Sequence, residues 1–317
     1  MNEKLLHDFK LNEQMNIPVL LKEVVNRTAK NGKAYLAIIF EDKSGEMDGM
    51  YWGVTPTEIQ TFVPGTVVQL HATRQMYRGK PQLKVANIKA VTAESKLQPS
   101  DFIATAPIRR QRMETEINQV LFSITNPEWN RIVRYLLQKH HDQFYSYPAA
   151  KKNHHSYTGG LAYHTLSIVR LAQGIVPLYP QINQGLLLAG ALLHDIGKTI
   201  ELSGPVSTSY TVAGNLLGHI AIADAEIVLA VKDLQLDENS ESILALRHVV
   251  LAHHGLLEYG SPVRPALLEA EVLHQLDELD ASIEMFTHTV EQTEPGKFSD
   301  RVYALDKRMI YHPKNLE

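Results

Sequence analysis

The residues best suited to chemistry are His194, Asp195 and Lys198, which follow directly after an apolar segment. The run 186–193 is apolar on every side, which predicts a central, buried helix. An imidazole and a carboxylate at the end of such a helix need partners, because burying an unpaired polar group costs several kcal/mol. Partner side chains must therefore come from other parts of the chain.

Histidine is the side chain that can supply those partners. The 317-residue chain has 15 histidines, most of them after residue 139, and it has no cysteine. The lack of cysteine excludes disulfides and thiolate metal sites, and is typical of a reducing cytoplasm. A metal ion would be bound by His and carboxylate groups, which suit Mn²⁺, Mg²⁺, Fe, Co²⁺ or Zn²⁺.

Composition and charge limit the class of protein. A hydrophobic content of 44% and a charged content of 21% are ordinary for a globular protein, and the length allows two domains. The net charge of −4 means that any nucleic-acid binding must come from a local patch. The N-terminus has no apolar signal core, and no apolar run reaches the length of a membrane span. We therefore expect a cytoplasmic protein without a membrane partner.

The first 90 residues have the pattern of short strands, punctuated by Gly and Pro. Five strands with one short helix before the fourth are the layout of an OB-fold, a small Greek-key barrel. The expected strands are 19–28, 34–42, 46–53, 66–77 and 81–91, and the expected helix is 56–62.

OB-folds often bind single-stranded nucleic acid on aromatic side chains and basic grooves. In a barrel this small, about half of the aromatic residues should instead lie in the core. Tyr51 and Trp52 are adjacent in a strand and point to opposite faces, so at most one of them should stack on a base. The candidate nucleic-acid-binding residues are Tyr35, Tyr51, Trp52, Arg74, Tyr77 and Arg78.

The rest of the chain is predicted to be almost entirely helical. We expect an OB-fold domain at 1–94, a linker with connecting helices at 95–150, and an all-α domain at 151–317. Asn126–Pro127 has the form of a helix start. The expected helices are 109–124, 126–150, a helix ending near 175, 186–193, 216–234, 241–255 and 265–293.

The order of metal-binding side chains on these helices resembles that of the HD phosphohydrolase superfamily. His164 is followed by the pair His194–Asp195 and then by a distant Asp277. The resemblance implies an all-helical, metal-dependent domain that hydrolyses phosphoesters, with these four residues as ligands. Asp280 lies one helical turn after Asp277 and is the alternative ligand or a partner of one.

Three further histidines resemble the forms of this fold that bind two metal ions. They are His219, His253 and His254. Adjacent residues of a helix diverge by about 100°, so only one of His253 and His254 need face the metal while the chain stays helical. We favour His253 as the ligand, with His254 lining the site.

The combination of an OB-fold and an HD domain resembles the YhaM family of bacterial 3′-to-5′ exoribonucleases over nearly the full chain. The stretches that carry this likeness are 154–165, 194–198, 201–220, 252–262 and 297–308. The resemblance implies that single-stranded RNA is degraded from its 3′ end to 5′-mononucleotides, with single-stranded DNA as a further substrate. A long C-terminal helix would also suit a homo-oligomer.

A His and Asp site of this kind suits hydrolysis by two ions about 3.5–4 Å apart, with Mn²⁺ as the favoured metal. In this hypothesis Asp195 bridges the ions and Lys198 stabilises the charge on the phosphate. Two alternatives remain. One is an HD hydrolase of nucleotides or cyclic dinucleotides, for which a strand-binding barrel has no use. The other is a nucleic-acid-binding protein with a non-catalytic HD domain.

Overall fold

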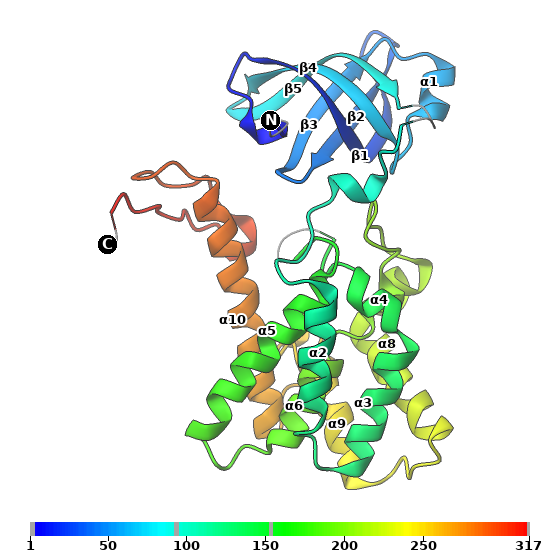
Figure 1. Cartoon of the computed structure of the whole chain (residues 1–317), viewed down its shortest axis with the longest axis vertical. Coiled ribbons are helices and arrows are strands. Elements are labelled where there is room, and N and C mark those ends of the chain that lie inside the picture. The colour runs from blue at the N-terminus through cyan, green and yellow to red at the C-terminus, as the bar shows by residue number, and fades with distance from the viewer. Residues whose placement is uncertain (1–3, 92–94, 152–154, 316–317) are drawn as a thin grey trace. The chain divides into compact units, whose positions relative to one another are not determined.

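The computed structural model of the chain describes residues 4–91, 95–151 and 155–315. The chain divides into two compact units, of which the first comprises residues 1–105 with 205–207 and the second the remainder. The first unit is a β-barrel and the second is helical (Figure 1). This confirms the predicted fold class. Residue 94, where the first domain was expected to end, and His154, which begins one of the family-like stretches, lie outside the described residues.

The first unit is a closed barrel with the strand order β1-β2-β3-β5-β4. Neighbouring strands are antiparallel except for β3 and β5, which pair in parallel. A short helix, α1 (Pro56–Thr61), lies between β3 and β4 in the chain, as expected for an OB-like barrel. The strands are β1 (Gln14–Thr28), β2 (Ala34–Asp42), β3 (Gly45–Trp52), β4 (Val67–Tyr77) and β5 (Lys80–Ala90).

Strand β1 closes the barrel because it pairs with two neighbouring strands. Residues 14–20 pair with β4, and residues 20–28 pair with β2. The register shifts between Leu21 and Glu23, which is the irregularity that bends a strand from one partner to the next. The core contains Val19, Leu36, Ile38, Phe40, Val68, Leu70 and Leu83.

The second unit is built from helices of which α6 is the centre (Figure 1). Every residue of α6 from Gly185 to Leu193 is buried, as its all-round apolar sequence predicts. The helices are α2 (Arg110–Leu121), α3 (Pro127–Lys139), α4 (His141–Ser146), α5 (Gly160–Ile175), α6 (Gln184–Leu193), α7 (Lys198–Glu201), α8 (Val212–Asp233), α9 (Glu241–Leu251) and α10 (Leu268–Glu291).

The segment 126–150, expected as one helix, forms two helices instead. Helix α3 ends at Lys139, and His140 has a non-helical backbone (φ −105°, ψ 21°) before α4 begins. The His140 Nε2 atom lies 2.6 Å from Glu226 of α8. The sequence gives no helix breaker here, so the contact of a buried imidazole with a distant helix was not predictable from it.

Helix α8 is, among the described residues, the one helix long and apolar enough to cross a membrane by length and composition. The same test is passed by core helices of globular proteins, so it is weak evidence. Here the apolar side chains Ala223, Ile227 and Ala230 are packed into the core of the helical unit. We therefore treat α8 as a core helix.

Candidate metal centre

The site begins at the end of α6, where His194 follows the last helical residue, Leu193. Residues 194–197 form a turn, and the short helix α7 starts at Lys198. Gly197 has a right-handed backbone (φ −60°, ψ −22°) and lies after the end of α6. The absence of a side chain at Gly197 matters for the packing of this turn against α8. A Cβ atom on Gly197 would lie 2.1 Å from the carbonyl oxygen of His219, so only glycine lets this turn approach α8.

The first group of candidate ligands surrounds His164 of α5. The Nε2 atom of His164 lies 3.1 Å from Asp277 Oδ1, 3.4 Å from His194 Nε2 and 3.6 Å from Asp195 Oδ2. His164 and His194 are fully buried, and the Asp277 side chain is 16% exposed. The structure therefore brings together the four residues that the superfamily resemblance implies, from α5, the turn after α6, and α10.

The second group comprises His219, His253 and His254, whose candidate ligand atoms all lie within 4.8 Å of one another. Helix α9 ends at Leu251 and does not continue to residue 255, as we had expected. Gly255 has a positive φ of 72°, a conformation that terminates helices. Because His253 and His254 lie in this turn, the 100° divergence of neighbouring helical residues does not apply, and both imidazoles join the group.

Asp195 lies between the two groups. Its Oδ2 atom is 3.4 Å from His194 Nε2, and its Oδ1 atom is 3.5 Å from His219 Nε2 and 4.0 Å from His253 Nε2. The residue is 2% exposed. Within the described part of the chain, neither carboxylate oxygen has a partner in hydrogen-bond geometry. A buried carboxylate in this state is stable only with a bound cation or a charged neighbour.

Three imidazoles of the site have Nδ1 beside a protein oxygen. Nδ1 of His194 lies 2.8 Å from the carbonyl oxygen of Ala191, and Nδ1 of His253 lies 2.6 Å from that of Val250. Nδ1 of His219 lies 3.3 Å from Glu201 Oε1. A carbonyl or carboxylate that accepts the Nδ1 proton leaves Nε2 unprotonated and free to bind a metal.

The unbound Nε2 atoms point to a cation as the missing partner. Among the described residues, Nε2 of His219 and of His253 is buried with no hydrogen-bond partner. These nitrogens and the Asp195 oxygens form a compact set of N and O donors without sulfur. That set fits Mn²⁺, Fe, Co²⁺ or Zn²⁺.

The electrostatics favour the cation-binding protonation state at Asp195 and His253, and the protonated state at His164. Burial raises the pKa of the Asp195 carboxyl, but the charges of Lys198 and His194 outweigh it and hold the pKa well below its usual range. Burial holds the pKa of His253 well below its ordinary value, so this imidazole is neutral. At His164 burial lowers the pKa, but Asp277 and Asp280 more than compensate and raise it to about 9. A cation must therefore displace a proton from His164.

Lys198 extends into the site from the start of α7. Its Nζ atom lies 2.7 Å from Asp195 Oδ2, and its side chain is 11% exposed. Burial lowers the pKa of this amine, but Asp195 outweighs burial and raises it. Lys198 is therefore a charged group beside the central carboxylate.

Two contributors to the site were not singled out from the sequence. Glu201 holds both the backbone N–H and Nδ1 of His219, at 3.0 and 3.3 Å. His155 contacts Asp280, which in turn lies 2.7 Å from His164 Nδ1. Both residues lie inside stretches that resemble the family, but their type and spacing alone give no role.

The barrel distributes the nucleic-acid candidates unevenly. Tyr35 and Trp52 are cross-strand partners whose rings stack at 4.3 Å, and Trp52 is 55% exposed. Tyr51 points the other way, packs against the barrel core and donates to Glu58. The Arg74 guanidinium donates to two backbone carbonyls, of His7 and Phe9.

The hairpin between β4 and β5 holds the remaining two candidates. Tyr77 is 50% exposed, and the Arg78 guanidinium lies 5.4 Å from the centre of its ring. Exposed rings beside a cation are suited to base stacking.

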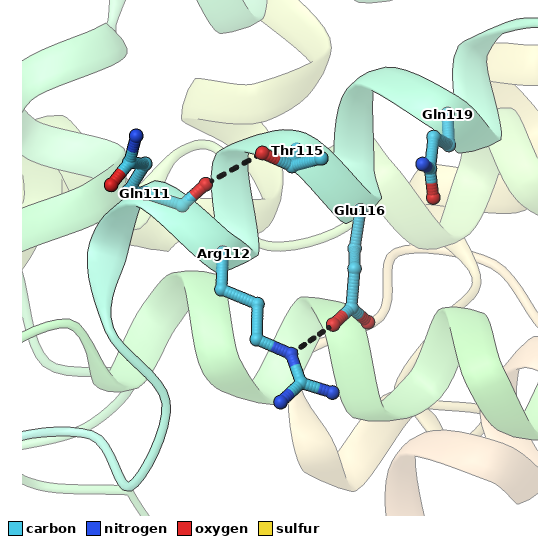
Figure 2. A pocket seen from close by; sticks show the side chains of 5 residues that line it. All are labelled: Gln111, Arg112, Thr115, Glu116 and Gln119. Carbon is cyan, nitrogen blue, oxygen red and sulfur yellow. Dashed lines mark hydrogen bonds and ion pairs between the residues drawn. The ribbon is translucent and has the colours of Figure 1, made fainter.

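A surface hollow of about 390 Å³ lies over α2 of the helical unit. Figure 2 shows Arg112 donating to Glu116 and Thr115 donating to the carbonyl of Gln111. Glu116 also accepts from Arg170 of α5. The lining of the hollow contains no candidate ligand. We assign it no role.

Comparison with known proteins identifies the class of the helical unit. The family model described as HD domain matches residues 161–282, and one described as a putative helicase, TraI_2, matches residues 94–179. Among solved structures, the HD domain of the Listeria monocytogenes phosphodiesterase PgpH covers 53% of this chain and 80% of that chain. Its TM-score is 0.31 and its identity 16%, too low to define the fold. The helical unit is an HD domain, preceded by an OB-like barrel.

The curated relatives define the family more closely. The 3′-5′ exoribonuclease YhaM of Listeria monocytogenes serotype 4b is 44% identical over 98% of this chain and 99% of its own length. The protein of the same name from Bacillus subtilis strain 168 is 44% identical over 98% and 97%. This chain belongs to the YhaM family of 3′-5′ exoribonucleases.

Proposed function

We propose that this chain is a metal-dependent 3′-to-5′ exoribonuclease that releases 5′-mononucleotides from single-stranded RNA. Membership of the YhaM family supports the reaction class. One observation of the structure carries the proposal. Asp195 is buried between two groups of imidazoles; its Oδ2 atom pairs with Lys198 Nζ, and among the described residues the buried Nε2 atoms of His219 and His253 have no hydrogen-bond partner.

The donors divide into two sets around that carboxylate. His164, His194 and Asp277 would hold one divalent ion, and His219 with His253 and His254 would hold the other. Asp195 faces both sets through its two oxygens. Bound ions would supply an activated water and neutralise the charge of the phosphoryl oxygens. Mn²⁺ is the metal that we favour for this donor set.

Lys198 would act on the phosphate. Its ammonium pairs with Asp195 Oδ2 at 2.7 Å, and a cation bound at this oxygen would weaken the pair because like charges repel. The nearest new partner for a buried ammonium is an anionic substrate. We therefore assign Lys198 to the non-bridging phosphate oxygens, where it stabilises the charge that develops during hydrolysis.

The OB-like barrel would bind the upstream part of the strand. The stacked pair of Tyr35 and Trp52 offers an exposed aromatic surface, and Tyr77 with Arg78 offers a second. Stacking tolerates any base, so single-stranded DNA is a further substrate that we propose. Arg74 and Tyr51, which have partners inside the barrel, are the weaker candidates. A cytoplasmic location and a homo-oligomer remain predictions from the sequence.

The proposal is tested with a 5′-labelled single-stranded RNA, the purified chain and Mn²⁺. We expect a ladder that shortens from the 3′ end and vanishes with chelator. Asp195→Ala should lose more than the roughly 10–100-fold that removal of an outer partner costs. The control is Asp237→Ala, which removes an exposed carboxylate before α9. Uncut RNA that is retained in a gel would contradict the enzyme and leave a binding protein.

A further inference from the structure

Asp280 of α10 lies between two imidazoles. Its Oδ2 atom is 2.7 Å from Nδ1 of His164 and 2.7 Å from Nε2 of His155. The other ring nitrogen of His155, Nδ1, is 2.7 Å from the hydroxyl of Tyr157. His164 and His155 are 0% and 2% exposed, and the Asp280 side chain is 12% exposed. The four side chains form a continuous, largely buried chain that begins at a candidate metal ligand.

The donor and acceptor in each of these hydrogen bonds follow from the chemistry of the four side chains. If His164 binds a cation through Nε2, it carries its proton on Nδ1 and donates that proton to Asp280. An ionised carboxylate only accepts, so His155 must also donate to it, from Nε2. Nδ1 of a neutral His155 then accepts, and the Tyr157 hydroxyl is the donor that faces it. Each contact has one donor and one acceptor.

The backbone holds His155 in a costly conformation. Its φ is +49°, in the left-handed region, which is sterically unfavourable for a residue with a side chain. Its carbonyl accepts a hydrogen bond from the N–H of Ala149 at 3.0 Å. A Cβ atom on Gly160 would lie 2.0 Å from the same carbonyl oxygen, so glycine is required beside it. Such strain persists where the surroundings hold a residue in place, often at functional sites.

We propose that His155 and Tyr157 are positioning residues for the metal centre: through Asp280 they fix the ring orientation and the tautomer of His164. The proposal rests on the proposed function, because it takes His164 as a metal ligand. Asp280 is in this account a hydrogen-bond acceptor and not a ligand, because its Oδ2 atom already contacts two ring nitrogens. In this proposal His155 acts through Asp280 and not by direct contact with the metal or the substrate.

The test is the affinity of the metal-free, full-length chain for Mn²⁺, measured by calorimetry without RNA. His155→Ala should weaken binding by about 10–100-fold, the usual cost of losing an outer partner of a ligand, and leave the number of bound ions unchanged. His155→Gln places an amide nitrogen near the position of Nε2 and should recover most of the affinity. Tyr157→Phe should weaken binding less than His155→Ala. His141→Ala, which alters a partly exposed imidazole outside this chain of contacts, is the control.

A second readout separates positioning from general stability. Nitrogen NMR of the metal-free protein should show His164 protonated on Nδ1 at a pH above its pKa of about 9, and a mixture of tautomers in His155→Ala. Unchanged affinity in His155→Ala, or loss of a whole ion, would overturn the proposal; the second result would make His155 a ligand. If His155→Ala does not fold, an undiminished affinity in Tyr157→Phe would overturn it. Failure of the unaltered chain to bind Mn²⁺ would instead remove the proposed function.

Discussion

Single residues determine which ring nitrogens face the metal centre. His194 and His253 each have Nδ1 beside a backbone carbonyl three residues earlier in the chain. His219 uses Glu201 and His164 uses Asp280 for the same purpose. A carbonyl beside Nδ1 is a local consequence of the turn, whereas a carboxylate must come from another element. A substitution can therefore remove the carboxylate partners, whereas it cannot remove the backbone carbonyls.

His164 makes the stability of the metal-free protein depend on pH. Its pKa is raised from an ordinary value of 6.5 to about 9, because Asp277 and Asp280 outweigh the effect of burial. The folded state thus binds the proton more tightly than the unfolded state. The resulting stabilisation is complete below pH 6.5 and is lost as the pH rises to about 9.

The measurement is chemical unfolding of the chelated protein between pH 6 and pH 9.5. The free energy of unfolding should fall over this range by up to about 3 kcal/mol, at 1.36 kcal/mol for each unit of pKa. In His164→Gln the fall should be smaller. An unfolding free energy that rises with pH in the unaltered chain would contradict the assigned ion pairs.

The residues that gather at the candidate metal centre could be predicted from the sequence, but the residues that orient them could not. His164, the His194–Asp195 pair and Asp277 were placed together through a family pattern on helices, and they do lie together. His155 and Glu201 are ordinary polar residues until the fold brings them to His164 and His219. Their roles depend on distances between elements, which sequence spacing does not contain.

Helix ends supply several of the candidate ligands, whereas His164 and Asp277 lie within α5 and α10. His194 follows α6, His253 follows α9, and His219 follows a break in α8 at Gly218, whose φ is 73°. Hydrophobic periodicity located the helices well, because their apolar faces are long. It missed the end of α9, because a turn rich in histidine carries no strong breaker before Gly255.

The close approach of the turn 194–197 to α8 gives a prediction for Gly197→Ala. The new Cβ would meet the backbone carbonyl of His219 at 2.1 Å, and backbone cannot rotate away as a side chain can. We expect a loss of about 1–3 kcal/mol in the free energy of unfolding, typical of overpacking, and a weaker affinity for Mn²⁺ because His219 is displaced.

The matched control for this substitution is Gly174→Ala in α5. Its Cβ would meet no atom within 4 Å, so helix propensity should make the protein more stable by up to about 1 kcal/mol. Both variants are compared by urea unfolding and by calorimetry with Mn²⁺. Equal stabilities for the two alanine variants would contradict the close packing of this turn.

At the scale of the whole molecule, the chain joins an OB-like barrel to an HD domain, and we propose that the barrel binds the strand that the HD domain hydrolyses. The five strands of the barrel were located from alternation and turn residues to within a few positions, apart from the earlier start of β1. The strand pairing that closes the barrel could not be derived from the sequence pattern, because the parallel pairing of β3 with β5 and the bulge in β1 are long-range features. The OB-like class therefore rested on strand count and the position of α1.

If the barrel binds the strand and the HD domain hydrolyses it, Trp52→Ala should affect binding and not hydrolysis. Loss of the indole ring on which one base would stack should raise KM for a long single-stranded RNA by roughly tenfold, since stacking is worth about 1–3 kcal/mol per base. The rate constant kcat, and the cleavage of a dinucleotide, should be unchanged. Tyr51→Phe, which alters the inward-facing neighbour, is the control. An equal loss on both substrates would contradict a role of the barrel in holding the strand.

The most direct test of the account is the number of Mn²⁺ ions bound per chain, measured by native mass spectrometry. We predict two ions in the unaltered chain. The double substitution His219→Ala and His253→Ala should leave one, because the group around His164 stays intact. Asp195→Ala should weaken both, because its oxygens face both groups. A single ion in the unaltered chain, or two ions in the double variant, would contradict a centre built from two groups that meet at Asp195.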